Sequence, residues 1–421
     1  MTNPPHNPAS PTEFSVLPSA RYGIVDLFAG PGGLDIAATI MDEVESIGVE
    51  WDDPTRATRR AAGLLTTTEK DVARLGPSDS EVKAANVLTG GPPCQSFSVA
   101  GNREGHKALE DVKWLASCLV ADHKNLKAFR KVWQAVKSET DGMSDGRTGL
   151  VLQPLRWIME AELDTGREPY QRIVLEQVPT VLPVWKHYAK LLRQIGYAAE
   201  AHVLHSEDFG VPQARRRAVL IAQHDPENTG RKVYFPEHTH QRYRKGVKRL
   251  QETAADASLG QQAIPLTGAA EAKPAILPWV SMGDALKETR TGKFVMVSNY
   301  GSGGDPKKRG RRSSWEPAPT VTGKVSRNRL FRLKRSGTGE LEDGEELARL
   351  TPRETGLLQS FPAAYPWRST NVAQQIGNAI PPLLSLHILS AALRDLPPKK
   401  EWIEALAAWQ PPAHDQAPAD A

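Results

Sequence analysis

The chain has 421 residues, a formal net charge of +4 at pH 7, 39% hydrophobic residues and two cysteines. Its length allows a sizeable buried core and predicts two or three domains, whereas two cysteines exclude a disulfide framework and a paired-cysteine zinc site. No uninterrupted apolar run approaches the length of a membrane span, and residues 1–20 lack the basic start and apolar middle of a secretory signal. We therefore expect a cytoplasmic protein with no membrane contact and no metal.

Charge is unevenly distributed along the chain. Residues 231–335 contain 22 Lys and Arg against 8 Asp and Glu, and the rest of the chain is net acidic. Such a concentration of positive charge predicts a region that binds a polyanion, with nucleic acid as the leading candidate. The alternative is a solvated basic surface without a partner.

The chain divides into five parts along its length. Residues 1–20 are rich in Pro and small polar residues, which predicts a tail, and residues 401–421 are expected to form a second tail. Over 21–235, strand-like runs alternate with helix-like runs, which predicts βαβ units and a parallel sheet. The strand-like runs are YGIVDLFAG, SIGVEWD, NVLTGGPP, RIVLEQV and RAVLIAQ. Residues 236–345, rich in Pro, Gly and basic residues, predict a separate irregular domain, and 346–400 return to helical patterns.

The first candidate site follows the first predicted strand. The run IVDLFAGPGGLD ends this strand in a glycine-rich turn before a helix, where the backbone can approach a ligand closely. Alone the pattern is weak, because a turn that serves only packing looks the same. The next strand ends at Glu50 and Trp51, where an acid can bind ribose hydroxyls and an indole can stack on an adenine.

The second candidate site is the run GGPPCQSFS over residues 90–98. The nucleophilic form of a cysteine is the thiolate, which needs a partly open, electropositive site. Two glycines and two prolines make a stiff, polar approach to Cys94 and favour a reactive cysteine there. Cys118 lies in an apolar helical pattern and is expected to serve packing.

Motifs in a fixed order give the chain a family resemblance. Over residues 22–395 the chain resembles the bacterial cytosine-5 DNA methyltransferases, which use S-adenosylmethionine. The motifs are DLFAGPGGLD, EWD, EKDV, GGPPCQSFS, DGRTGLV, QARRR, RETGLLQSFP and QIGNAIPP. The resemblance implies an α/β fold, a Rossmann-like methyltransferase sheet with an inserted, irregular target-recognition domain at 236–345.

The resemblance also implies a mechanism and a set of site residues. Cys94 would add to carbon 6 of a flipped-out cytosine, Glu176 would hydrogen-bond ring nitrogen 3, and Arg217, supported by Arg215, would bind the ring carbonyl oxygen. Gln95 and Ser98 would belong to the mobile loop over the flipped base. The cofactor-binding residues implied by the same motifs are Asp26, Phe28, Gly30, Gly32, Gly33, Leu34, Glu50, Trp51, Asp71, Pro93 and Asn378.

Two features depart from the family pattern. Gln177 follows Glu176 where family members commonly carry Asn, and we expect activity to be retained because the chemistry requires the carboxylate. The segment 106–144 resembles an insertion beside the mobile loop. It is either a solvated helical elaboration or an element that contacts DNA or controls closure.

The implied partners are duplex DNA, S-adenosylmethionine and a companion restriction endonuclease that acts separately, with the protein itself a monomer. Two other functions stay open at this point. An RNA cytosine-5 methyltransferase is the nearer one, although its tRNA-modifying branch resembles PPCQPFT where this chain has Ser96 and Ser98. The other is a catalytically silent DNA-binding regulator, against which Cys94, Glu176 and Arg217 argue.

Overall fold

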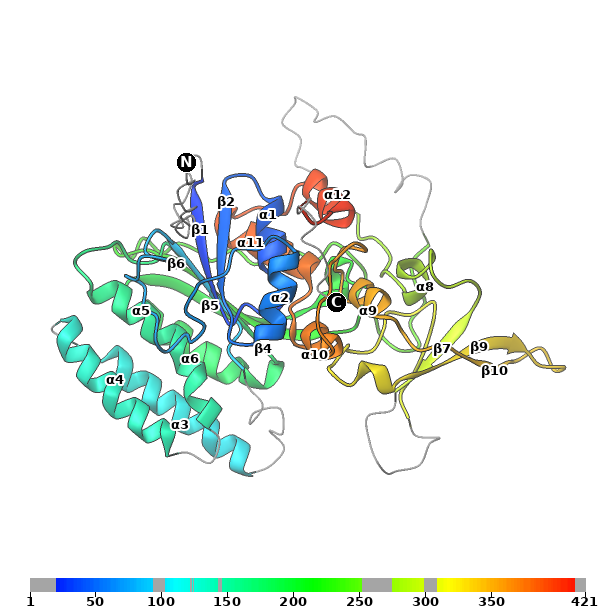
Figure 1. Ribbon diagram of the computed structural model, residues 1–421, viewed down its shortest axis with the longest axis horizontal. Helices are drawn as coiled ribbons and strands as arrows, with labels where there is room; N and C mark the ends of the chain where they lie inside the picture. Colours follow the sequence, from blue (N-terminus) through cyan, green and yellow to red (C-terminus); the bar gives the residue numbers. More distant parts are fainter. Residues whose placement is uncertain are drawn as a thin grey trace, which may run out of the picture.

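The computed structural model describes residues 20–93, 103–121, 123, 125–142, 146–251, 275–298 and 309–412, and two sheets organise them (Figure 1). The larger sheet has the strand order β2-β1-β3-β4-β6-β5, in which β6 runs antiparallel to both neighbours. Its strands are β1 (Tyr22–Leu27), β2 (Val44–Val49), β3 (Val87–Gly90), β4 (Arg172–Gln177), β5 (Tyr197–His205) and β6 (Arg216–His224). This sheet, with helices between its parallel strands, confirms the predicted α/β class.

Helices cover both faces of the larger sheet, and successive side chains of β1 point to opposite faces. Val25 packs into one core and Ile24 into the other, because side chains alternate across a strand. On the first face, α5 and α6 lie against the strands and α3 and α4 pack outside them. The helices of this face are α3 (Arg103–Val120), α4 (Leu126–Asp141), α5 (Gln153–Leu163) and α6 (Leu182–Gln194).

The second face is covered by α1 (Asp35–Ile40), α11 (Pro382–Arg394) and α12 (Lys400–Ala408). The helix α2 (Asp53–Ala61) follows β2 and begins where the Asp52 side chain accepts a hydrogen bond from the Thr55 amide at 3.0 Å. Short 3-10 helices are η2 (Gly146–Leu152), η3 (Pro179–Val181), η4 (Ser206–Phe209) and η7 (Val325–Arg327).

The described residues after α11 pack into the large domain. The composition predicts a tail over 401–421, but the structure continues through α12 with Trp402 and Leu406 buried in the core of the second face. The prediction of a tail is therefore wrong for the residues up to 412, because two apolar side chains one helical turn apart give α12 a buried stripe.

The segment Val372–Arg394 is long and apolar enough to cross a membrane by length and composition alone, although Gln374, Gln375 and Asn378 interrupt its apolar residues. It contains α10 (Val372–Asn378) and α11, and 83% of its most apolar stretch is buried inside the fold. Leu384, Leu386 and Ile388 of α11 are fully buried. The hydropathy of this segment is that of a helix buried in the core.

The smaller sheet is antiparallel, with the order β10-β9-β7-β8. Its strands are β7 (Phe294–Val297), β8 (Arg311–Ser313), β9 (Arg329–Arg335) and β10 (Leu341–Leu347). Its core, which also contains residues of α8 (Met282–Ala285), includes Leu358 from α9 (Pro352–Leu358) and Ile376 from α10. The smaller domain is therefore built partly from residues beyond 345, where the composition predicts its end.

The predicted insertion 106–144 is helical, since α3 and α4 fill most of it. Phe129, Trp133 and Val136 of α4 are buried in the core of the first face. The pair of helices is thus part of the packed layer on that face, and its role in DNA binding or loop closure stays a prediction.

Candidate active site

The sheet register brings the predicted site segments to one edge. Leu27 of β1 pairs with Gly90 of β3, and Gly90 pairs with Leu175 of β4. The glycine-rich turn, the turn that leads toward Cys94, and Glu176 therefore leave neighbouring strands at the same edge. Because β6 is antiparallel to β4, its beginning lies at this edge as well and contributes Arg217. Ligands of open α/β sheets bind at the carboxyl ends of the parallel strands.

Glu176 and Arg217 form an ion pair between Oε1 and Nε. The two side chains are 14% and 11% exposed, so water screens the pair weakly. Burial raises the pKa of the Glu176 carboxyl, and the Arg217 charge opposes that rise. Burial likewise lowers the pKa of Arg217, with Glu176 opposing. The carboxyl is therefore shifted toward its protonated form, in which it can donate a hydrogen bond.

The turn after β3 is tied to this pair. The Gln177 side-chain amide donates to the Pro92 carbonyl, and the Gln177 oxygen accepts from the Val178 amide. A Cβ on Gly91 would lie 3.3 Å from Oε2 of Glu176, so a side chain there would crowd the carboxylate. Gln177 thus holds the backbone of the turn before Cys94 and of Val178.

Three of the predicted catalytic residues, Cys94, Gln95 and Ser98, lie outside the described residues. Pro93 is the last described residue before them. Their predicted roles stay predictions.

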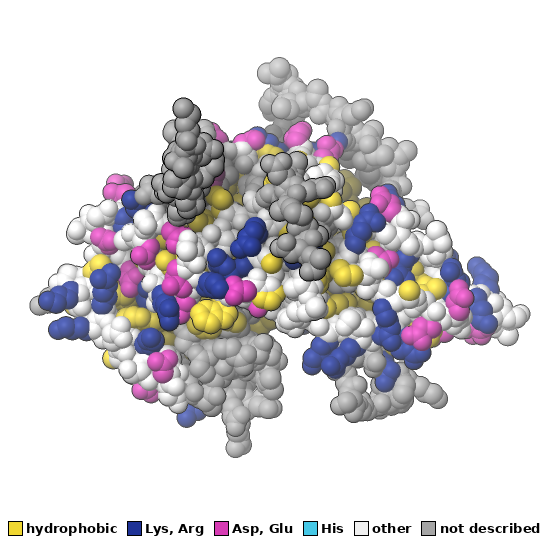
Figure 2. Space-filling model, viewed as in Figure 1, with side chains coloured by type: hydrophobic (Ala, Val, Ile, Leu, Met, Phe, Trp, Pro, Cys, Tyr) yellow, Lys and Arg dark blue, Asp and Glu magenta, His cyan; other side chains and the backbone are white. Residues whose placement is uncertain are grey.

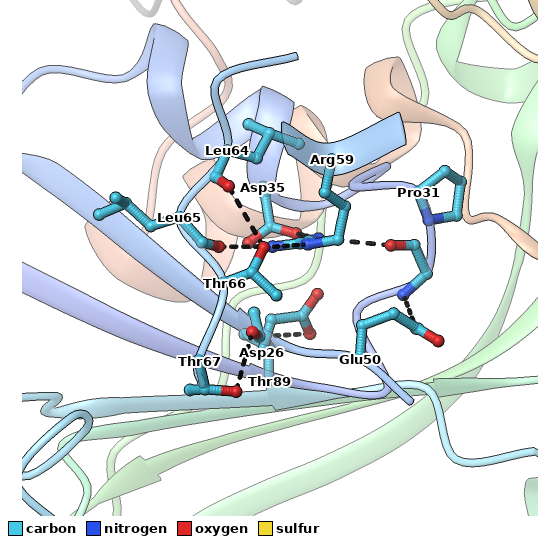
Figure 3. A network of polar contacts seen from close by, with 12 residues as sticks. Asp26, Pro31, Asp35, Glu50, Arg59, Leu64, Leu65, Thr66, Thr67 and Thr89 are labelled. Atoms are coloured by element: carbon cyan, nitrogen blue, oxygen red, sulfur yellow. Dashed lines mark hydrogen bonds and ion pairs between the residues drawn. The ribbon is translucent and has the colours of Figure 1, made fainter. Parts of the chain in front are cut away.

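The predicted cofactor residue Glu50 lies beside the glycine-rich turn (Figure 3). Glu50 follows β2, and its carboxylate accepts from the amides of Gly30 at 2.7 Å and Asp52 at 2.8 Å. Burial raises the pKa of Glu50. Trp51 is 69% exposed, and a Cβ on Gly30 would meet nothing within 4 Å. A bonded carboxylate, an open turn and an exposed indole fit a nucleoside-containing cofactor.

The backbone of the turn explains its residue types. Phe28, Gly30 and Gly32 have positive φ values of 61°, 56° and 98°. A Cβ on Gly32 would lie 2.2 Å from the Leu64 side chain, and one on Gly33 would lie 2.1 Å from the Ile380 carbonyl oxygen. Gly32 is therefore required by conformation and by close packing, and Gly33 by close packing alone.

A buried polar cluster around Arg59 contacts the glycine-rich turn (Figure 3). The fully buried Arg59 makes an ion pair of 2.6 Å with Asp35 and also donates to the Gly30 carbonyl at 3.4 Å. It donates further to Thr66 Oγ1 at 2.9 Å and to the Leu65 carbonyl at 2.8 Å. The sequence pattern gives no sign of this arrangement, because an arginine in a short helix is ordinarily a solvated residue.

Two predicted cofactor residues belong to the interior instead of the ligand side. Asp26 is buried, and its carboxylate accepts from Thr89 Oγ1 at 2.6 Å; burial first and Asp35 second raise the pKa of Asp26. Leu34 is buried in the core of the second face. Their contacts to a cofactor stay predictions.

Two further predicted cofactor residues lie on other segments. Asn378 is exposed at the end of α10, and its side-chain oxygen accepts from Gln374 at 2.7 Å. Asp71 is partly exposed and caps a turn by accepting from the Ala73 amide at 2.9 Å. Their contacts to a cofactor stay predictions.

Arg215 has a different place from the one that its motif predicts. The buried guanidinium donates to the carbonyls of Val321 at 2.8 Å, Gly377 at 2.9 Å and Ala379 at 2.9 Å. The motif predicts that Arg215 helps Arg217 bind a ring oxygen. Because backbone carbonyls accept from the Arg215 guanidinium, its role in this structure is to position these backbone segments. Gln213, which the sequence analysis did not select, acts alongside: its side chain bonds the Val321 amide at 2.7 Å and the Leu358 carbonyl at 3.1 Å.

The basic part of the smaller domain is partly neutralised within the protein. Across the β9–β10 hairpin, Arg329 pairs with Glu346, Arg332 with Glu345 and Lys334 with Glu342. Figure 2 shows basic and acidic side chains side by side on this projecting hairpin. The run RNRLFRLKR is thus only partly available for a polyanion.

Among the residues that the structure describes, no group of three or more His, Cys, Asp and Glu side chains could hold a metal ion.

Comparison with known proteins gives a family match. Residues 22–123 and 136–394 match the sequence model of the family described as C-5 cytosine-specific DNA methylase. The unmatched residues 124–135 cover the start of α4 and the turn before it. Most of the predicted insertion 106–144 therefore lies within the match.

Individual relatives cover nearly the whole chain. The Type II methyltransferase M1.HphI of Haemophilus parahaemolyticus is 27% identical over 394 residues, which cover 88% of this chain and 86% of that protein. The Type II methyltransferase M.MthTI of Methanothermobacter thermautotrophicus is 25% identical over 395 residues, which cover 89% and 97%. Among solved structures, the methyltransferase EhMeth of Entamoeba histolytica has a TM-score of 0.50 at 13% identity, over 89% of this chain and 98% of that chain. That last likeness supports the fold alone.

Proposed function

Because the chain belongs to the C-5 cytosine-specific DNA methylase family, we propose that it methylates carbon 5 of a cytosine within a specific duplex DNA sequence through a covalent adduct of Cys94. Membership makes the chain a DNA cytosine-5 methyltransferase, and its relatives are Type II methyltransferases. The covalent step, the flipped base and the cofactor are the parts that we propose.

The residues around the glycine-rich turn would hold S-adenosylmethionine. Glu50 would accept hydrogen bonds from the ribose hydroxyls, Trp51 would stack on the adenine, and the open backbone at Gly30 would lie against the rest of the cofactor. When bound, this cofactor supplies the electrophilic methyl group that carbon 5 of the cytosine accepts. A cofactor held by these residues would lie next to the turn that leads to Cys94, because β1 pairs with β3.

The chain's own residues activate the base. The Cys94 thiolate adds to carbon 6 and so makes carbon 5 nucleophilic. Glu176 donates a hydrogen bond to ring nitrogen 3 as negative charge develops there, and Arg217 stabilises the charge at the ring oxygen. Once carbon 5 carries the methyl group, a base removes the proton from carbon 5, and the electrons of that bond re-form the C5–C6 double bond as the C6–S bond breaks, which restores both the aromatic ring and free Cys94.

The target must leave the duplex for this chemistry. Neither face of a stacked cytosine is accessible, so the base is flipped out at a cost of a few kcal/mol. We infer that the enzyme acts as a monomer on DNA in the cytoplasm, and that a separate restriction endonuclease reads the same site. The smaller domain between β6 and α9 would recognise the sequence through base-edge contacts.

The observation that carries the proposal is the nearly buried Glu176–Arg217 ion pair. It lies next to Gly91, in the turn just before Cys94. A carboxyl with a raised pKa beside a guanidinium, at the ligand-binding edge of the sheet, suits a ring that gains charge on nitrogen 3 and its oxygen.

The test begins with a cytosine methylation map of DNA from a methylation-free bacterial host that expresses the gene. Duplexes that contain the mapped site are then made with 5-fluorocytosine at the target, since fluorine blocks the release step. We expect a covalent complex that survives denaturation, forms in the presence of S-adenosylmethionine and is absent with Cys94→Ser. A wild-type protein that binds this duplex without methylating or trapping it would be a silent regulator, and methylation of tRNA in place of the duplex would assign the RNA reaction.

A further inference from the structure

The C-terminal segment 395–412 lies beyond the family match and packs beside the cofactor turn. The match ends at residue 394, whereas the described chain continues through α12 to residue 412. Figure 1 shows α12 next to α1, the helix that the glycine-rich turn enters, and Trp402 and Leu406 bury against the same core as α1. The segment is thus an addition in contact with the support of the turn.

The end of this segment reaches an aromatic cluster. Trp409 lies against Tyr365 with ring centroids 5.7 Å apart and an interplanar angle of 36°. Tyr365 also contacts Phe361 at 4.8 Å and Trp367 at 4.7 Å, so aromatic rings enclose it. Pro412, at the end of the described segment, lies beside Gly63, since a Cβ on Gly63 would be 2.5 Å from Pro412 Cγ.

Tyr365 connects the cluster to the turn. Its buried hydroxyl donates to the Pro31 carbonyl, and burial raises the pKa of Tyr365, so the hydroxyl keeps its proton. The preceding carbonyl, that of Gly30, accepts from Arg59 (Figure 3). Two successive carbonyls of the turn are therefore held by two side chains from distant parts of the sequence.

We propose that Tyr365 and Trp409 are positioning residues for the cofactor turn. Trp409 fixes the ring of Tyr365, and the Tyr365 hydroxyl fixes the Pro31 carbonyl, so the open backbone at Gly30 already has its binding shape before the methyl donor arrives. A pre-shaped site binds more tightly because less conformational freedom is lost on binding. This inference rests on the proposed function of the turn as the cofactor site.

The first test measures the turn without any cofactor. Amide hydrogen exchange of residues 29–36 is followed in the full-length protein for Tyr365→Phe, Trp409→Ala and Trp409→Phe. We expect exchange about 3- to 10-fold faster in Tyr365→Phe, the effect of one lost hydrogen bond, a smaller acceleration in Trp409→Ala, and near-normal exchange in Trp409→Phe. The matched control is Tyr22→Phe, which removes another buried hydroxyl-to-carbonyl bond, to Leu393 O at 2.6 Å.

The second test measures binding and turnover. By calorimetry, the dissociation constant of S-adenosylhomocysteine should rise about 3- to 10-fold in Tyr365→Phe, while kcat and the KM for DNA stay within about twofold of wild type. Trp409→Ala combined with Tyr365→Phe should be no weaker than Tyr365→Phe alone, because both act through one hydroxyl.

Unchanged exchange and unchanged S-adenosylhomocysteine affinity in Tyr365→Phe would overturn the inference. So would a Tyr22→Phe control that alters the turn equally, or a Trp409→Phe variant as impaired as Trp409→Ala. These results are separable from the proposed function: a wild type that traps duplex DNA with a turn indifferent to Tyr365 refutes the inference alone. A wild type that never traps DNA refutes the proposed mechanism, and the exchange result still decides whether Tyr365 holds the turn.

Discussion

The large and small domains of this protein arrange their charges in opposite ways. At the edge of the larger sheet, Glu176, Arg217, Asp35 and Arg59 are nearly or fully buried and paired inside the fold. On the β9–β10 hairpin of the smaller domain, each cross-strand partner is at least one-third exposed. Buried pairs are costly to break and fix geometry, whereas exposed pairs contribute little and can exchange partners.

This contrast separates two tasks. The large domain holds a few groups in one arrangement, as a covalent reaction requires. In the small domain, Lys and Arg side chains of β9 pair with Glu side chains of β10 across the hairpin. The phosphates of DNA can take the place of these glutamates as partners of the basic side chains. Each prediction below alters one of these two kinds of charge.

The largest effect is expected from Glu176→Gln. The amide keeps the shape of the side chain but cannot transfer a proton toward ring nitrogen 3, so kcat should fall about 10²- to 10⁴-fold. The measurement is single-turnover methylation of the mapped duplex. The matched control is Glu162→Gln, another carboxyl whose pKa burial raises, which accepts from Tyr197 at 2.6 Å away from the site. If Glu176→Gln reduces turnover no more than this control, Glu176 is not the acid.

The next effect concerns stability. Arg59→Met leaves Asp35 buried without its cation and should lower the free energy of unfolding by about 3–5 kcal/mol. Adding Asp35→Leu should recover much of that loss, since the unpaired charge is then removed. Arg332→Met on the hairpin should cost no more than about 1 kcal/mol. Urea unfolding measures the free energy of unfolding of all three variants. If Arg59→Met and Arg332→Met lowered it equally, the proposed difference between the charge pairs of the two domains would be wrong.

Much of the larger sheet could be predicted from the sequence because its strands are short apolar runs and its turns contain glycines. The run RIVLEQV predicts β4, and the order of motifs identifies the family, which the comparisons confirm. The conjunction of Glu50 with the glycine-rich turn was also predictable, since strand ends of a parallel sheet meet at one edge.

Other features depend on contacts between residues far apart in the chain. Arg59 is buried only because Asp35 and backbone carbonyls are there to receive its donors, and no local pattern records that. Arg215 fits a catalytic motif, yet it binds carbonyls more than a hundred residues away. The acidic strand β10 follows the basic window, so composition overstated the free charge of the small domain.

The pH dependence of kcat/KM tests whether the Glu176 carboxyl acts in its protonated form. Since burial raises the pKa of Glu176, the protonated carboxyl persists to higher pH than usual, and kcat/KM should fall about tenfold per pH unit above that raised pKa. Glu176→Gln should lose this fall in kcat/KM with rising pH; a fall that persists in this variant belongs to another group.

The smallest effect is expected on the hairpin. In the double variant Glu342→Gln and Glu345→Gln, Lys334 and Arg332 lose their partners, so stability should change by no more than about 1 kcal/mol per pair. The freed cations become available to phosphates, so nonspecific duplex binding should tighten at low salt. The slope of log affinity against log salt should steepen by up to about 1.8, at about 0.9 for each phosphate contacted.

The matched control for this hairpin variant changes the same net charge elsewhere, with Glu200→Gln and Glu227→Gln on exposed positions of the large domain. Fluorescence anisotropy over a salt series compares the two double variants. Long-range attraction of DNA depends on the net charge of the protein, whereas direct contact with phosphates depends on where the cations lie. The same slope change in the control would therefore show that the hairpin variant acts only through net charge. A steeper slope in the hairpin variant alone would place Arg332 and Lys334 against the DNA backbone.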